Sequence, residues 1–326
     1  MAYGNTPSVS LYLLIGIKKM TINEQLENQA PVPKRGYFSK HWHGELSLAK
    51  SYWVNFWLLS IVFAFIVVFW MTLSINENPV FYSRTMLIMM AVIYLIIYPW
   101  QIIGLWRSAT NTTANTGKTF WPRIVKFLVI IGVLGSFIAE MQDKEWYKQL
   151  YYDAFVLSKA KNYDVSVKKS IITVNGDFDY GISDKVEKIL KNDQSIKFII
   201  LNSDGGLLYE ANKLSKLILL NSLNTHTNDG CRSACTIAYI AGNTRYIYKD
   251  ADLGFHQYSI ARPSARVDKL TLLDLLRDQE EDAKFFQKRG ASKTFTDQMY
   301  KYEADDMWYP SINDLKHYGV VHKILE

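Results

Sequence analysis

Residues 199–206 read Ile-Ile-Leu-Asn-Ser-Asp-Gly-Gly, and this stretch decides the fold of the second half of the chain. The continuous apolar run 198–201 is typical of a strand buried in a parallel sheet. The pair Gly205-Gly206 ends the strand, and 208–220 has apolar residues at helical spacing. Such a unit can direct free backbone N–H groups at an anion. Taken alone, however, a glycine pair more often marks an ordinary strand-to-helix turn.

Two later segments supply side chains suited to nucleophilic catalysis. Ser233 stands between Gly230 and the apolar stretch 234–241, where we expect a helix to begin. The helix N-terminus would stabilise negative charge there, and the N–H of Ala234 could face an oxyanion. His256 ends a short apolar run. Each residue alone is more often a cap or a structural histidine, but their order and spacing favour a serine hydrolase.

Strands and helices alternate through this half of the chain. We expect strands at 170–174, 197–201 and 244–248, and helices at 183–191, 209–220, 233–240 and 267–289. This alternation predicts an α/β domain with a mainly parallel sheet. A loop at 259–264 follows His256.

The ordered motifs resemble the proteolytic subunit of the Clp protease, within the Clp/crotonase fold. No single motif is specific, but the ordered set is, and it covers 171–321. The motifs are Ile-Ile-Thr-Val-Asn-Gly at 171–176, Asn-Ser-Asp-Gly-Gly at 202–206, Ser-Ala at 233–234, Ala-Gly at 241–242, Phe-His-Gln at 255–257 and Tyr-Gly-Val-Val at 318–321.

The resemblance implies a role for each residue of the site. Ser233 would be the nucleophile and His256 the general base. The N–H groups of Gly206 and Ala234 would form the oxyanion hole, and Gly205 would shape the turn. The same resemblance implies a peptide or protein substrate and assembly into a homo-oligomer.

The family's acid lies shortly before its final helix, where this chain has Asp305 and Asp306. Counting back from Trp308 favours Asp306. The spacing counted back from Ser311, the expected N-cap of the final helix, differs by one residue from the family's spacing, so both carboxylates stay candidates.

The chain departs from the family pattern at two places. Asp204 replaces the proline that precedes the family's glycine pair, and Cys-Arg-Ser-Ala-Cys at 231–235 replaces a run of small residues. These changes indicate a divergent, membrane-linked branch. Cys231 and Cys235 are the only cysteines. Their spacing on a helix allows a disulfide, and two small buried thiols fit the sequence equally.

The first half of the chain is apolar. The 326-residue sequence suggests about two domains, and it is 49% hydrophobic with nine Trp. Runs at about 52–73, 86–106 and 124–139 have the length and composition of membrane-spanning helices. Buried helices of a soluble domain are the less favoured alternative.

Charge predicts the topology. Basic residues gather before the first run and between the second and third runs, which places both segments in the cytoplasm. We therefore expect a cytoplasmic segment 1–51, a transmembrane region 52–140, a connector 141–168 and a catalytic domain 169–326 in the periplasm, anchored in a bacterial inner membrane. Met20 is an alternative start to Met1.

Other function classes are less favoured. The net charge of +6 comes without a basic stripe or a nucleic-acid motif, so we expect no nucleic-acid partner. His41 and His43 lack further nearby ligands, so we expect neither a metal nor another cofactor. Two alternatives to the peptidase remain. One is a thioester-handling, crotonase-like enzyme, which generally dispenses with a Ser/His/Asp triad. The other is an inactive membrane scaffold with the same fold.

Overall fold

The computed structural model describes residues 35–74, 78–159, 161–258 and 269–326. The expected loop at 259–264 and Met20 lie outside these ranges. The chain divides into two compact units, Met1–Phe63 with Leu95–Gly132, and Ala64–Tyr94 with Val133–Glu326. We call the first the basic helical unit and the second the sheet unit, and each is described by itself.

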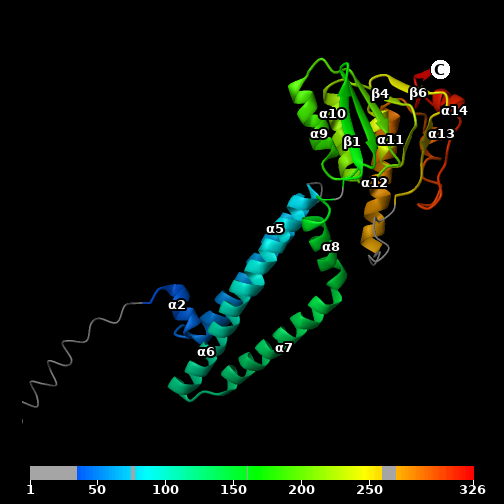
Figure 1. Cartoon of the computed structure of the whole chain (residues 1–326). Helices are drawn as coiled ribbons and strands as arrows, with labels where there is room; N and C mark the ends of the chain where they lie inside the picture. Colours follow the sequence, from blue (N-terminus) through cyan, green and yellow to red (C-terminus); the bar gives the residue numbers. More distant parts are fainter. Residues whose placement is uncertain (1–34, 75–77, 160, 259–268) are drawn as a thin grey trace, which may run out of the picture. The chain divides into compact units, whose positions relative to one another are not determined.

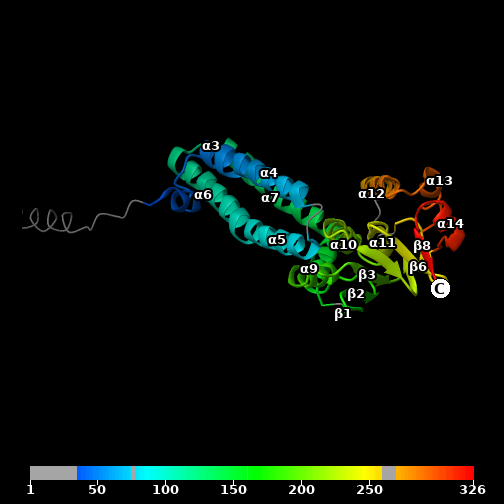
Figure 2. The ribbon, with the colours of Figure 1, turned by 90° about the horizontal axis from the view of Figure 1, so that it is seen from above.

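A six-stranded sheet forms the centre of the sheet unit, in the order β1-β2-β3-β4-β6-β8. Figure 2 shows β1, β2 and β3 in sequence at one edge. Only the pair β1 and β2 is antiparallel, so the prediction of a mainly parallel α/β domain is confirmed. The strands are β1 (Tyr163–Lys168), β2 (Ile171–Gly176), β3 (Phe198–Asn202), β4 (Asn224–Thr227), β6 (Arg245–Tyr248) and β8 (Lys323–Leu325). Two short parallel strands, β5 (Gly230–Arg232) and β7 (Asp252–Gly254), form a separate pair.

Helices connect the parallel strands, as crossover connections require. They are α9 (Ile182–Asn192), α10 (Leu208–Leu220), α11 (Cys235–Ile240), α12 (Lys269–Lys288), α13 (Lys293–Thr296) and α14 (Ile312–His317), and α8 (Lys144–Phe155) precedes the sheet. Figure 1 shows α9 and α10 side by side. Glu210, buried on α10, accepts hydrogen bonds from the N–H groups of Gly181 and Ser183. It therefore satisfies donors that the first turn of α9 leaves without partners.

Within the described ranges, three helical stretches are long and apolar enough to cross a membrane: Leu48–Leu73, Pro79–Thr116 and Phe120–Gln142. All three are longer than the sequence predicted. The second is about 57 Å long at 1.5 Å per residue, well beyond a hydrocarbon core of about 30 Å. The second stretch consists of α5 (Pro79–Val92), η2 (Ile93–Ile97) and α6 (Tyr98–Thr116). The first consists of α3 (Leu48–Lys50), η1 (Ser51–Leu58) and α4 (Leu59–Ser74), and the third is α7 (Phe120–Gln142). A short helix, α2 (Tyr37–Trp42), precedes all three.

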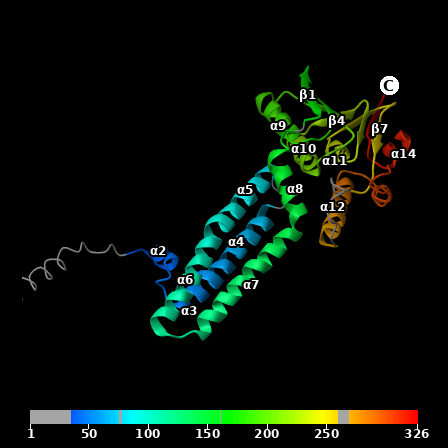
Figure 3. The ribbon, with the colours of Figure 1, turned by 60° about the horizontal axis from the view of Figure 1, so that its bottom comes forward.

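Two π-helical segments interrupt these helices, and each has a local cause. Pro99 lacks an N–H and its ring crowds the carbonyl of Leu95, which the wider turn of η2 accommodates. In the basic helical unit, Gln101 donates to the carbonyl oxygen of Asn55 at 2.8 Å, within η1. The amide side chain thus satisfies a backbone group of the π-helix. Figure 3 shows α2 and α3 beside α6 in this unit.

Among the residues that the structure describes, the core of the sheet unit contains one fully buried cation, Arg245 on β6. Its guanidinium donates to the carbonyl oxygens of Val320, Gly319 and Arg289, at 2.7, 2.8 and 3.0 Å. Burial lowers the pKa of Arg245 to about 10. The charge is therefore retained at neutral pH, and it ties the last segment of the chain to the sheet.

We expect Arg245→Met to destabilise the sheet unit by about 3 kcal/mol or more, because several buried carbonyl groups lose their donor. Chemical denaturation of the full chain, followed by tryptophan fluorescence, measures the change. Arg277→Met is the matched control, since Arg277 is exposed and pairs only with neighbouring carboxylates on α12. Equal midpoints for the two variants would contradict this assignment.

Candidate active site

Ser233 occupies a strained turn between β5 and α11. Its φ of 52° is in the left-handed region, which is uncommon outside glycine and costs on the order of 1 kcal/mol. Its N–H donates to the carbonyl oxygen of Gly254 at 2.9 Å. We expected the helix to begin at Ser233, but it begins at Cys235 because a positive φ cannot continue a right-handed helix. The hydroxyl is thereby held ahead of the helix.

His256 faces this hydroxyl. The parallel register of β5 and β7 pairs Arg232 with Gly254. Ser233 directly follows β5 and His256 comes two residues after β7, so both lie at the same end of the pair. His256 Nε2 lies 2.7 Å from Ser233 Oγ, within hydrogen-bonding distance. Burial lowers the pKa of His256, so the imidazole is neutral at neutral pH and able to accept a proton.

The glycine pair lies directly against the nucleophile turn. Gly205 has a φ of 115°, and a Cβ at that position would lie 2.7 Å from Ser233 Cβ and 3.2 Å from the backbone nitrogen of Ala234. Gly206 has a φ of 136°. Within the described ranges, the N–H groups of Gly206 and Ala234 have no hydrogen-bond acceptor. They are therefore available to an oxyanion.

Arg232 connects the turn at Asp204 to the segment that precedes His256. Its guanidinium lies 2.5 Å from a carboxylate oxygen of Asp204 and 2.8 Å from Asp252 on β7. These carboxylates raise the pKa of Arg232 further. The residue before Ser233 thus joins the glycine turn to the strand that leads to His256. The sequence analysis marked the segments of Asp204 and Arg232 as unusual, but no sequence pattern indicated that these two residues pair.

Cys231 and Cys235 are joined in a disulfide, with Cα atoms 5.3 Å apart. Both are buried, and they enclose Ser233 in a short covalent loop. In an oxidising compartment this bond would restrain the turn that presents the hydroxyl.

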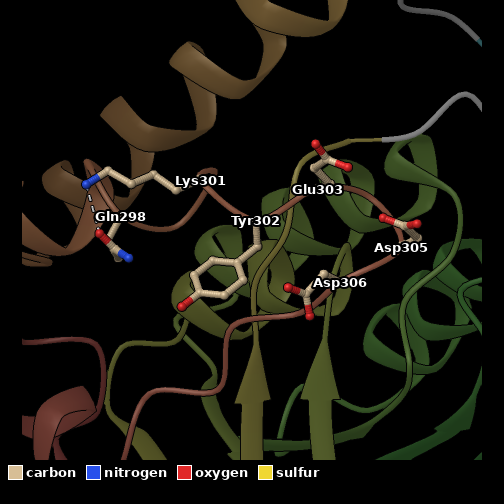
Figure 4. A pocket seen from close by; sticks show the side chains of 6 residues that line it. All are labelled: Gln298, Lys301, Tyr302, Glu303, Asp305 and Asp306. Atoms are coloured by element: carbon tan, nitrogen blue, oxygen red, sulfur yellow. Dashed lines mark hydrogen bonds between the residues drawn. The ribbon is translucent and has the colours of Figure 1, made fainter.

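Neither candidate acid contacts His256. The carboxylate of Asp306 accepts the N–H of Met307 at 2.8 Å and is exposed. Asp305 and Asp306 both line an open pocket of about 360 Å³, together with Glu303 and Tyr302 (Figure 4). His256 Nδ1 is buried and has no hydrogen-bond partner in the part of the chain that the structure describes. The site is therefore a Ser–His pair whose third member is not in contact.

A cluster of half-buried phenols that the sequence analysis missed lies beside this pair. Tyr300 donates to the hydroxyl of Tyr258 at 3.0 Å, and Tyr258 donates to the carboxylate of Asp282. Burial raises the pKa of Asp282 to about 6. Tyr258 and Tyr300 line a cavity of about 10 Å³ with Ser233, His256 and others. This volume is about that of one water-sized sphere, so a substrate side chain entering here must displace a wall. Tyr258 is two residues from His256, but no sequence pattern links it to Asp282.

We expect Gly205→Ala to abolish reaction of Ser233 with an active-site probe, because the added methyl would overlap Ser233 and the positive φ disfavours alanine. Labelling of the full chain by a fluorophosphonate measures the loss. Gly132→Ala on α7 is the control, since a Cβ there meets nothing within 4 Å. Undiminished labelling of Gly205→Ala would contradict the close approach.

Comparison with known proteins gives a limited likeness. No known family's sequence model matches the chain, and no curated protein matches it. Among solved structures, ClpP1 from Listeria monocytogenes matches with a TM-score of 0.40 and 19% sequence identity, covering 48% of this chain and 91% of that one. A single-residue mutant of the same protein matches with the same values.

Proposed function

We propose that the chain is a membrane-anchored serine hydrolase of the Clp type that cleaves peptides or proteins. The observation that carries this proposal is the 2.7 Å contact between Ser233 Oγ and His256 Nε2. It occurs at a left-handed turn whose next N–H, that of Ala234, has no acceptor among the described residues. A capping serine would instead have its side chain bonded to the helix it precedes.

The proposed reaction begins when Ser233 Oγ attacks the substrate carbonyl carbon and passes its proton to His256 Nε2. The N–H groups of Gly206 and Ala234 stabilise the resulting oxyanion, an effect worth about 3 kcal/mol per donor. The intermediate expels the amine, which takes the proton from His256, and leaves an acyl-enzyme. A water molecule then attacks the acyl carbon and gives its proton to His256 Nε2. The second tetrahedral intermediate expels Ser233 Oγ, which takes that proton back from His256, and the acid is released.

In the active arrangement, we propose that a carboxylate oxygen of Asp306 or Asp305 accepts a hydrogen bond from the Nδ1–H group of His256. Hydrogen bonds clamp the loop that carries them beside the histidine. Gln257 donates to the Tyr302 carbonyl at 2.9 Å, and Phe255 and Trp308 exchange two backbone bonds. We propose that a rearrangement between these two anchors brings a carboxylate to Nδ1. Apo enzymes often hold catalytic hydrogen bonds open in this way.

The setting of the enzyme follows from charge and hydropathy. We propose a multi-pass protein of a bacterial inner membrane with the sheet unit's catalytic domain in the periplasm, where the disulfide would be stable. Membrane-associated peptides and proteins are the proposed substrates, and homo-oligomerisation is the proposed assembly. The proposed chemistry uses no cofactor.

A specific observation favours a second candidate, an inactive scaffold with the same fold. His256 Nδ1 has no partner in the described residues, and the carboxylate of Asp306 is engaged elsewhere. A scaffold would keep the fold and lose the reactivity of Ser233, so one labelling experiment separates the two functions.

We expect a fluorophosphonate to label the full chain in membranes, and Ser233→Ala to remove the label. Ser166→Ala on the exposed face of β1 is the matched control and should label normally. If Asp306 is the acid, Asp306→Asn should lower the labelling rate by more than tenfold, with Asp305→Asn nearly unchanged. Absence of labelling in the wild-type chain would favour the scaffold.

We expect the labelling rate to rise with pH through the pKa of His256, because only the neutral imidazole accepts the serine proton. Burial lowers this pKa, so the midpoint should fall below 6.5. Rates measured between about pH 5 and pH 8 should follow a single titration. A midpoint above 6.5 would show that a carboxylate already stabilises the imidazolium.

A further inference from the structure

The basic helical unit contains an apolar cavity of about 480 Å³, far from the residues of the serine site in sequence. One side is formed by the start of the first membrane-length helix, including Ala49 and Trp53. The other is formed by the start of α7, including Trp121 and Leu128. The volume is in the range of pockets that bind small molecules.

The cavity has a packed floor. Val125 and Pro122 line it and are buried. Val125 belongs to a small core with Leu105 and Val129, against which Leu48 and Tyr52 pack. The shape is therefore held by the fold of the unit and is more than a gap between loose side chains.

Among the described residues that line this cavity, Lys118 supplies the one ammonium group. Lys118 follows Gly117, the left-handed residue that ends α6, and precedes α7. It lies between the end of the second membrane-length helix and the start of the third. Trp53 and Trp121 are 64% and 67% exposed beside it. Indoles with an ammonium at the end of apolar helices are typical of the interface between hydrocarbon and headgroups.

The charged side chains of the basic helical unit are nearly all positive. The described part of the unit contains one acid, Glu45, which is paired with Arg35. The other bases are Lys40, Lys50, Arg107, Lys118, Arg123 and Lys126. Three of these lie over aromatic rings, Lys50 over Tyr37, Arg107 over Trp42 and Lys126 over Trp106. Lys118 has no ion-pair or ring partner within the described ranges, so its charge is free for a ligand.

We infer that this cavity binds an anionic phospholipid, with one acyl chain against the apolar wall and the phosphate on Lys118. The acyl chain covers the apolar wall of the cavity, and the headgroup phosphate supplies the counter-charge to Lys118. Basic pockets between membrane helices recognise lipid headgroups by this combination. The inference requires that the helices lie in a bilayer, and it is independent of the serine chemistry.

Native mass spectrometry of the full chain in detergent tests this inference. Phosphatidylglycerol and phosphatidylcholine with identical acyl chains are titrated separately, so that only headgroup charge differs. The wild-type chain should retain phosphatidylglycerol preferentially. Lys118→Gln should reduce that preference about fivefold, the effect of one ammonium near a headgroup. Lys40→Gln, the same charge change at an exposed site outside the cavity, should leave the preference unchanged.

Filling the cavity provides a second test. Ala49 and Leu128 are exposed residues of the wall, so Ala49→Trp and Leu128→Trp place an indole in the cavity without replacing its floor. Each variant should lose the bound lipid of either headgroup, with an unchanged gel-filtration profile. Equal retention of both lipids by the wild-type chain, or preference undiminished in Lys118→Gln, would overturn the inference. A dimer that Ala49→Trp dissociates would assign the cavity to a second copy instead.

Discussion

The serine site depends on one steric constraint, the contact between the backbone of Gly205 and that of Ser233. No side chain fits at residue 205, because its Cβ would lie 2.7 Å from Ser233 Cβ. The close approach of Gly205 to Ser233 affects both the oxyanion-binding N–H groups and the Ser–His pair. It places the glycine turn against the nitrogen of Ala234, and it coincides with a left-handed Ser233 whose hydroxyl meets His256. A strained backbone persists only when its surroundings hold it.

Three kinds of bond hold that turn. Ser203 exchanges backbone hydrogen bonds with Gly230 and Arg232, which join the end of β3 to β5. The Arg232 guanidinium joins Asp204 to Asp252, and the disulfide closes the loop around Ser233. A rigid proline before the glycine pair would restrict that segment by itself. Here an ion pair takes that place, so the aspartate at 204 and the arginine at 232 form one structural feature.

The sequence predicted those features that depend on neighbouring residues. The apolar run at 198–201 became β3, and the helical spacing at 208–220 became α10, because both patterns report burial directly. The turn at Ser233 could not be predicted, since its φ depends on Gly205, far away in the chain. Strands β5 and β7 have three residues each, too few to show a period. The π-helix η1 depends on Gln101, an amide more than forty residues away.

The Nδ1 nitrogen of His256, which has no hydrogen-bond partner among the described residues, is an energetic defect of the site. A buried donor without an acceptor costs about 1–3 kcal/mol, and the neutral imidazole that accepts from Ser233 at Nε2 must carry its proton at Nδ1. A carboxylate that reached Nδ1 would recover this energy and stabilise the imidazolium. The loop with Asp305 and Asp306 is anchored at Tyr302 and Trp308, on either side of them. The same energetic defect that argues for a scaffold is therefore also a driving force for assembling the triad when a substrate arrives.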